Sequence, residues 1–268
     1  MMKKNLLLIL MCFVCGLVYA HDGLNFRNLD VKSGISDNYV RSVLRDQYGF
    51  MWFATLNGLN RYDGYQFKKY TTTQLGAYNN DIESIAEDAA GNIWIKGPVS
   101  YYIYDREQDK LENKIQPVLN KYGITGEVSY LTVDKDYNLW CTVMDTLFHY
   151  DFAKSKLHTF QLPGKEKMQQ VVCRRSCAYL LFSNGEIARI DSNFQHIRPE
   201  TRRTISSGLQ YNLYIDTVDR LWFYASHASG LQCYDTNQKQ WIDYVGRQEV
   251  TDALITAVMD DGDGNLWI

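Results

Sequence analysis

The chain has 268 residues, of which 46% are hydrophobic and 22% charged, a composition typical of a globular protein with room for a sizeable core. Its formal net charge of −3 provides no electrostatic footprint for a nucleic-acid partner, so we expect no nucleic-acid contact. Twenty Tyr, eleven Phe and six Trp beside only four Pro favour β structure.

Residues 1–20 have the pattern of a signal peptide. Two lysines precede an apolar run at residues 6–18, and Ala20 ends a cleavage site. The apolar run is too short for a comfortable membrane span. We therefore expect the chain to be exported, with a lead-in segment at residues 21–34 of the exported chain.

The first repeated unit lies at residues 45–63 and reads as strands joined by tight turns. Gly49 supplies the positive φ that a hairpin turn needs. Residues 50–55 are rich in aromatic and apolar side chains, which suits a buried strand. Asn57 and Gly58 then turn the chain into a further strand.

The spacing of Asp and Trp in this unit recurs along the chain. Asp stands six residues before Trp five times, and the steps between these Trp residues are 42, 46, 82 and 45 residues. The step of 82 covers two periods, and in the missing copy Arg174 and Leu180 take the places of Asp and Trp. A fixed period of this size, with about four strand signals per unit, is the signature of propeller blades. The pairs are Asp46/Trp52, Asp88/Trp94, Asp134/Trp140, Asp216/Trp222 and Asp261/Trp267.

The sequence therefore predicts an all-β fold: a β-propeller of four-stranded blades at residues 35–268, incomplete, with five blades and the start of a sixth. We expect each Trp to pack between blades and each Asp to cap its turn. Tyr137 stands at a turn position where other units have Gly, which predicts a strained left-handed backbone there. An open ring leaves an unpaired strand edge, so we expect a fragment of a longer protein. The blades are expected near residues 35–70, 81–111, 126–160, 168–197, 209–244 and, in part, 253–268.

Three strings in the first blade carry a resemblance to a known family. They are Gly-Ile-Ser-Asp-Asn-Tyr-Val at 34–40, Asp-x-x-Gly-x-x-Trp-Phe-x-Thr at 46–55 and Asn-Gly-Leu-Asn-Arg-Tyr-Asp-Gly at 57–64. Together they closely resemble the two-component regulator propeller repeat, and less complete copies follow along most of the chain. The chain thus resembles the N-terminal part of the periplasmic sensor region of a hybrid two-component system.

This resemblance implies a larger protein with two seven-bladed propellers, an immunoglobulin-like domain and a transmembrane helix that anchors it in the inner membrane. Cytoplasmic histidine kinase, receiver and DNA-binding parts would follow. The implied ligand is an oligosaccharide whose binding controls genes for glycan use. The implied partners are the rest of the sensor polypeptide and a second copy in a homodimer of the full-length protein. The 268 residues carry no kinase motif, so we expect no enzymatic activity from them.

No catalytic residue, metal site or cofactor is predicted. Residues 134–138 and 261–265, both Asp-x-Asp-x-Asn, resemble the opening of a calcium loop, but Leu follows where that loop needs Gly. The five His residues lack the spacing of a zinc site. Four cysteines follow the signal peptide and are either buried as small hydrophobic side chains or oxidised after export. They are Cys141, Cys173, Cys177 and Cys233.

Ligand contacts are expected on one face of the propeller, where the loops into each blade meet the loops between second and third strands. Aromatic rings would stack on sugar rings, and amide groups would bond to hydroxyls. The alternative is that these are ordinary solvated loop residues. The candidates are Asn38, Tyr39, Asn57, Tyr78 and His227.

Two other functions stay open on the sequence alone. A free-standing secreted propeller could act as a binding or scaffold module. A polysaccharide lyase or hydrolase could use the same fold, but glycoside hydrolysis needs two facing carboxylates, and no pair stands out in the sequence.

Overall fold

The computed structural model describes residues 28–268 except 165, 175–176, 192, 207, 227, 229, 243–253 and 263–264. The predicted signal peptide and residues 21–27 of the lead-in segment lie outside the described residues. Among the described residues, helical structure is limited to short pieces: η1 (Val31–Ser33), η2 (Thr73–Leu75) and α2 (Gln116–Lys121). Within the described part of the chain, none of these has the length and apolar character that a membrane crossing requires.

The strands form five four-stranded antiparallel sheets and one two-stranded sheet, each with its strands in chain order. Blade one contains β1 (Val40–Arg45), β2 (Met51–Thr55), β3 (Gly58–Tyr62) and β4 (Phe67–Tyr70), and blade two contains β5 (Ser84–Glu87), β6 (Ile93–Lys96), β7 (Tyr101–Asp105) and β8 (Lys110–Glu112). Blade three contains β9 (Val128–Val133), β10 (Leu139–Val143), β11 (Thr146–Asp151) and β12 (Lys156–Gln161), and blade four contains β13 (Met168–Arg174), β14 (Cys177–Phe182), β15 (Glu186–Ile190) and β16 (Ile197–Arg202). Blade five contains β17 (Tyr211–Ile215), β18 (Arg220–Ala225), β19 (Gln232–Asp235) and β20 (Gln240–Ile242), and the last sheet contains β21 (Met259–Asp260) and β22 (Leu266–Trp267).

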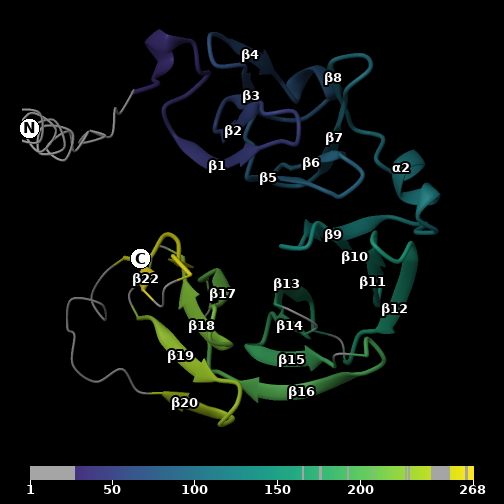
Figure 1. Ribbon diagram of the computed structural model, residues 1–268, viewed down its shortest axis with the longest axis vertical. Coiled ribbons are helices and arrows are strands. Elements are labelled where there is room, and N and C mark those ends of the chain that lie inside the picture. The colour runs from purple at the N-terminus through teal and green to yellow at the C-terminus, as the bar shows by residue number, and fades with distance from the viewer. Residues whose placement is uncertain are drawn as a thin grey trace, which may run out of the picture.

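The sheets follow one another around a common centre, with the first strand of each blade innermost (Figure 1). The inner strands of successive blades lie side by side, as β1 does with β5 and β13 with β17. The ring is open between the β21–β22 sheet and blade one. The predicted all-β propeller of four-stranded blades, incomplete, is therefore confirmed.

Four of the five repeated Trp residues pack between blades, as expected, whereas Trp267 of the incomplete last unit is 61% exposed, so the expectation is wrong there. Trp52 contacts a cluster that includes Ile93 of blade two, and Trp94, the next residue on β6, faces blade three. Trp140 packs against blade four, and Trp222 packs against the segment that leads to β21. All four are buried. Because side chains alternate along a strand, each Trp faces the following blade while its neighbours face the preceding one.

The spacing of six residues between Asp and Trp has a direct structural cause. In blade one, Oδ1 of Asp46 accepts hydrogen bonds from the backbone N–H groups of Tyr48 and Phe50, both at 3.0 Å. Oδ2 of the same carboxylate accepts from Nε1 of Trp52 at 2.9 Å. We call this arrangement the Asp–Trp clasp. It recurs at 2.8 Å in Asp88/Trp94, Asp134/Trp140 and Asp216/Trp222.

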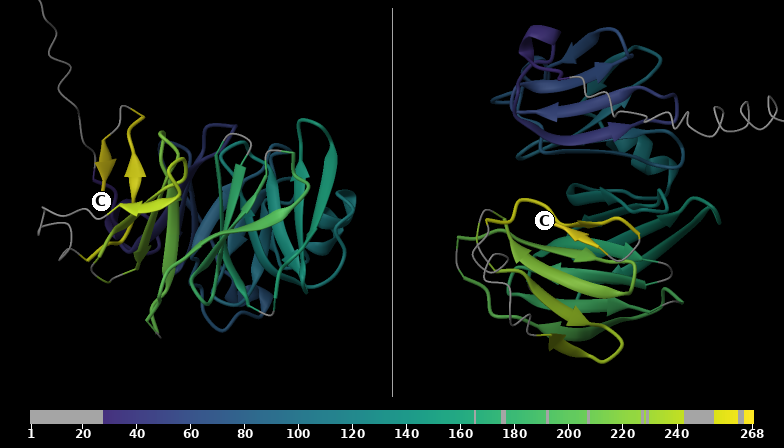
Figure 2. Two further views of the ribbon diagram at one scale, coloured as in Figure 1. Left: turned by 90° about the horizontal axis from the view of Figure 1, so that it is seen from below. Right: turned by 60° about the vertical axis from the view of Figure 1, so that its left-hand side comes forward.

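The clasps define one face of the propeller, which we call the clasp face. The opposite face, called the lead-in face, carries the entry into each first strand and the turns between second and third strands. Figure 2 shows from the side that the strands run between these two faces. The register of blade one confirms the arrangement, because Val40 pairs with Thr55 at the lead-in end and Arg45 with Met51 at the clasp end.

Blade four requires one correction to the sequence-based assignment. The spacing of the repeat placed Leu180 in the Trp position, but Leu180 packs beside Trp140 at the junction with blade three. Tyr179 instead belongs to the cluster shared with blade five. Tyr179 therefore occupies the side of the sheet that Trp takes in the other blades.

A turn that is one residue shorter explains this shift. Trp52 pairs with Leu44 across seven intervening residues, whereas Tyr179 pairs with Val172 across six. In the other blades the Trp stands six residues after the Asp. The same count from Arg174 therefore reaches Leu180, one residue beyond Tyr179. A shift of one residue along a strand moves the side chain to the opposite face of the sheet.

Arg174 stands where the other blades have the clasp Asp, and it makes different contacts. Its Nε donates to Oδ1 of Asp219 at 3.1 Å, and its Nη2 donates to the carbonyl oxygen of Thr217 at 2.6 Å. Both acceptors lie in the β17–β18 turn of blade five. Arg174 thus links two blades.

The predicted left-handed residue in the clasp turn is confirmed. Tyr137 has φ 61°, in the region that Gly49 and Gly91 occupy in blades one and two with φ 88° and 82°. Asp219 of blade five has φ 65°. The turn geometry is therefore retained in these four blades even where the residue is not glycine.

Candidate functional site

The structure brings four of the five predicted ligand residues to the lead-in face of blade one. Asn38 and Tyr39 immediately precede β1, and Asn57 lies in the β2–β3 turn. Tyr78 lies between η2 and β5, in the segment that leads from blade one to blade two. His227, the fifth candidate, lies outside the described residues.

The four side chains differ in what they contact. Oδ1 of Asn38 accepts a hydrogen bond from the backbone N–H of Val31 at 2.9 Å, which ties the lead-in segment to the start of blade one. Oδ1 of Asn57 accepts from the side-chain amide of Asn80 at 3.4 Å. Tyr39 is 53% exposed and Tyr78 is 100% exposed. The two tyrosine rings therefore present the accessible aromatic surface of this group.

The same face carries exposed apolar residues that were not among the predicted ligand residues. Val99 (93% exposed) and Met144 (86% exposed) lie in the turns between second and third strands of blades two and three. Leu56 occupies the corresponding turn of blade one and is also exposed. The sequence does carry a signal for this surface, because the turn between the second and third strands contains an apolar residue in each of the first three blades. Exposed apolar side chains at equivalent loops indicate a surface suited to contact.

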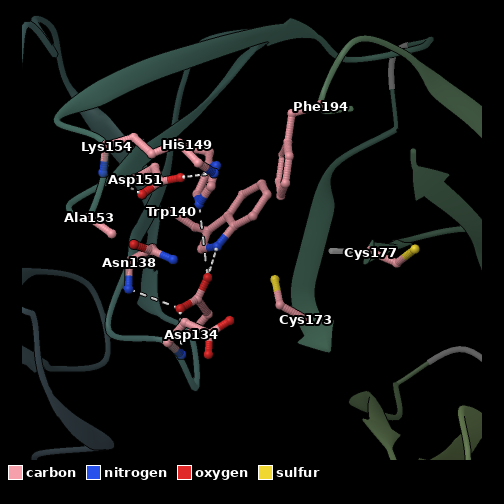
Figure 3. A pocket seen from close by; sticks show the side chains of 11 residues that line it. Asp134, Asn138, Trp140, His149, Asp151, Ala153, Lys154, Cys173, Cys177 and Phe194 are labelled. Carbon is pink, nitrogen blue, oxygen red and sulfur yellow. Dashed lines mark hydrogen bonds and ion pairs between the residues drawn. The ribbon is translucent and has the colours of Figure 1, made fainter. Parts of the chain in front are cut away.

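A second candidate site lies on the clasp face, between blades three and four, where no ligand residue was predicted. A cavity of about 250 Å³ opens there, and Figure 3 shows the side chains around it. Its walls come from the clasp turn and from β11 of blade three, and from β13, β14 and the β15–β16 turn of blade four. The lining residues are Asp134, Asp136, Asn138, Trp140, His149, Asp151, Ala153, Lys154, Cys173, Cys177 and Phe194.

The centre of this cavity wall is a cluster of three aromatic rings. The imidazole of His149 packs on the indole of Trp140, with centroids 4.0 Å apart, and on the ring of Phe194, with centroids 4.8 Å apart, while Trp140 and Phe194 are 6.1 Å apart. His149 is only 2% exposed, and within the described part of the chain neither ring nitrogen has a hydrogen-bond partner. Its Nε2 lies 3.9 Å from Oδ2 of Asp134. Burial lowers the pKa of His149 to about 4, so the ring is neutral at pH 7.

The Asp-x-Asp-x-Asn string at 134–138 forms the clasp turn of blade three. Oδ1 of Asp134 accepts from the backbone N–H groups of Asp136 and Asn138, both at 2.9 Å. Burial raises the pKa of Asp134 above its ordinary value. In the described residues, no group of three or more His, Cys, Asp and Glu side chains is arranged to hold a metal ion.

The two cysteines near this cavity face different blades. Cys173 packs with the cluster shared by blades three and four, and Cys177 packs with the cluster shared by blades four and five. Both are free thiols, as are Cys141 and Cys233. Burial raises the pKa of Cys173, which keeps its thiol protonated at neutral pH.

Comparison with known proteins gives a specific match in blade one. Residues 34–57 match the family model described as "Two component regulator propeller". The chain carries a two-component regulator propeller repeat. The matched repeat contains the blade one clasp and includes Asn38, Tyr39 and Asn57 among the predicted ligand residues. No curated protein matches the chain in sequence.

Solved structures extend the likeness of fold to most of the chain. The extracellular domain of the putative hybrid two component system BT3049 from B. thetaiotaomicron is 21% identical, with a TM-score of 0.62 over 90% of this chain and 33% of that one. The corresponding domain of BT4673 is 19% identical, with a TM-score of 0.58 over 90% and 34%. Virginiamycin B lyase from Staphylococcus aureus is 16% identical, with a TM-score of 0.59 over 91% and 80%. The chain thus spans about a third of the length of the two-component domains.

Proposed function

We propose that this chain is part of the extracytoplasmic sensor region of a hybrid two-component regulator and that it takes part in binding an oligosaccharide. The observation that carries this proposal is the two-component repeat at residues 34–57, which forms the clasp and lead-in face of blade one. The fold likeness to two extracellular domains of putative hybrid two component systems supports it. Virginiamycin B lyase shares the fold as well, so it is the repeat, and not the fold, that favours the sensor function.

The lead-in face has the chemistry that a sugar ligand needs. Tyr39 and Tyr78 offer exposed aromatic surface on the face that also carries the amides of Asn38 and Asn57. Aromatic rings stack on apolar sugar faces, and loops on a rigid scaffold hold them in position. A ligand that binds one arrangement of the sensor region more tightly than another would shift the balance between them. The partners in that change would be the rest of the sensor polypeptide and a second copy.

Calorimetry tests this function most directly. The complete sensor region is titrated with a panel of oligosaccharides, as wild type and as the Tyr39→Ala and Tyr78→Ala variants. Loss of one aromatic contact is expected to weaken the binding of the recognised glycan about fivefold to tenfold. Tyr65→Ala is the matched control, because Tyr65 is also an exposed tyrosine but lies in the β3–β4 turn on the clasp face.

Two results would contradict the proposal: no binding to any glycan of the panel, or equal loss of affinity in the Tyr65→Ala control. The same samples also examine the lyase and hydrolase alternative. If the chain cleaved the glycan, shorter products would accumulate during the titration, and the reaction heat would continue after saturation.

A further inference from the structure

The clasp carboxylates provide four versions of one site within the same chain. In three of them a further side chain donates to the Asp Oδ2 that already holds Trp Nε1. These extra donors are Nη1 of Arg106 to Asp46 at 3.1 Å, Nδ2 of Asn92 to Asp88 at 2.8 Å, and Nε of Arg220 to Asp216 at 2.7 Å.

Asp134 differs from the other three clasp carboxylates. Among the residues that the structure describes, Trp140 is the one side chain that donates a hydrogen bond to it. Asn138 stands four residues after Asp134, as Asn92 does after Asp88, but its Oδ1 accepts from the backbone N–H of Phe152 instead. The cavity between blades three and four opens beside Asp134, where the other clasps hold a donor.

The junction of blades one and two shows what occupies this position when it is filled. Arg106 comes from the β7–β8 turn of the following blade, and it reaches back to Asp46 and to Oε1 of Glu87 at 2.9 Å. The corresponding turn of blade four contributes Phe194, whose ring packs on His149. The guanidinium of Arg106 therefore fills this position at the junction of blades one and two, whereas the junction of blades three and four has an open cavity.

The charges around the cavity favour a cation. Asp134, Asp136 and Asp151 line it together with a single lysine, Lys154. The ammonium group of Lys154 is already paired with Oδ2 of Asp151 at 2.8 Å. Among the described residues, Asp134 and Asp136 have no lysine or arginine partner, so an anionic ligand would be repelled by their carboxylates, whereas a cation would neutralise them.

The unpartnered imidazole adds a second requirement. A buried polar group without a partner is costly, and a neutral imidazole has one nitrogen that donates and one that accepts. His149 Nε2 and Asp134 Oδ2, 3.9 Å apart, can both reach one bound nitrogen atom that carries several N–H groups. A cavity of about 250 Å³ is several times the volume that a water molecule occupies, so it has room for a small organic group.

We propose that the cavity between blades three and four binds a small organic cation with N–H donors, a primary ammonium or a guanidinium, which pairs with Asp134 beside His149. This site lies on the clasp face and is independent of the glycan contacts proposed for the lead-in face. The bound cation takes the place that Arg106 holds at the junction of blades one and two.

The test uses four probes that separate charge, donors and size. Glucosamine carries a primary ammonium, agmatine carries an ammonium and a guanidinium, tetramethylammonium is a cation without N–H groups, and glucose is a neutral sugar. Binding to the intact chain is followed by calorimetry and by the NMR signal of the Trp140 indole N–H, which reports on Asp134. We expect glucosamine and agmatine to bind with a Kd of about 1 mM or tighter, with a shift of the Trp140 signal.

Substitutions locate the site. Asp136→Asn removes one lining charge without removing the backbone N–H that bonds to Asp134, and it is expected to weaken cation binding about fivefold. His149→Phe keeps a ring in the cluster, removes both nitrogens and is expected to weaken binding at least as much. Glu107→Gln, an exposed charge on the clasp face of blade two, is the matched control and should leave affinity unchanged.

The proposal is overturned if neither N–H cation binds, or if tetramethylammonium or glucose binds as tightly as glucosamine. It is also overturned if Asp136→Asn and His149→Phe, shown to be folded by circular dichroism, both retain full affinity. Failure here leaves the glycan result intact, because Tyr39 and Tyr78 lie on the opposite face.

Discussion

Blade one and blade four meet the same structural requirement with different residues. Blade one closes its first turn with Asp46, which accepts from two turn amides and from Trp52. Blade four has Arg174 at that position and uses it to contact the β17–β18 turn of blade five. A four-stranded blade can therefore form without the clasp. What the two blades share is the alternation of buried residues on the second strand, whose side chains point to opposite faces of the sheet in turn.

The largest effect in this comparison is expected from the tryptophan itself. Trp52→Ala removes a fully buried indole and leaves Oδ2 of Asp46 without that donor, so unfolding free energy should fall by about 4 kcal/mol. Tyr179→Phe, at the corresponding position of blade four, removes only the hydroxyl and keeps the ring, so it should cost about 1 kcal/mol or less. Urea unfolding of both variants measures the difference. Equal losses would contradict the expectation that burial of the ring, more than the hydrogen bond of its polar group, stabilises these positions.

The sequence predicts those features of the structure that depend on contacts between residues close together in the chain. The clasp joins residues six apart, so its spacing was visible in the sequence, and the fold and the Trp packing followed from it. Leu180 was assigned wrongly because a turn one residue shorter shifts every later position on the strand. The cavity at Asp134 could not be predicted, since it depends on residues from two blades. It also depends on the contact that Asn138 makes with the backbone N–H of Phe152, and the residue type alone does not predict that contact.

A pH titration sharpens the comparison at the junction of blades three and four. The pKa of His149 is lowered by burial to about 4, below its ordinary value of 6.5. The unfolded chain therefore binds a proton more readily between these values, and stability falls as the pH drops from about 6.5 to about 4. The full loss from this group is on the order of 3 kcal/mol.

The His149→Phe variant isolates this contribution. Lys154, His158 and Asp151 also act on His149, and the raised pKa of Asp134 has the opposite effect on stability as the pH falls. The difference between wild type and His149→Phe should therefore be measured, as urea midpoints from pH 7 to pH 4. A pH-independent difference would contradict burial of the neutral imidazole.

Arg174 allows the link between blades four and five to be broken without changing the blade four core. Arg174→Met keeps most of the aliphatic side chain and removes the bonds to Asp219 and Thr217, which should cost about 1–2 kcal/mol. The comparison is Arg202→Met, an exposed position on the outer strand of the same blade whose loss should be within about 0.5 kcal/mol. A loss in Arg202→Met as large as that in Arg174→Met would show that the link is not specific.

The smallest effect concerns the left-handed position of the clasp turn and has opposite signs in two blades. Tyr137 has φ 61° and an exposed ring, so Tyr137→Gly should relieve backbone strain and stabilise the protein by up to about 1 kcal/mol. Gly49 has φ 88°, and a Cβ there would meet no atom within 4 Å, so Gly49→Ala should destabilise by about 1 kcal/mol through its backbone alone. Thermal midpoints of the two variants test this directly. Because the clasp holds both turns in one conformation, shifts of the same sign would mean that Tyr137 stabilises its turn by some contact of its ring.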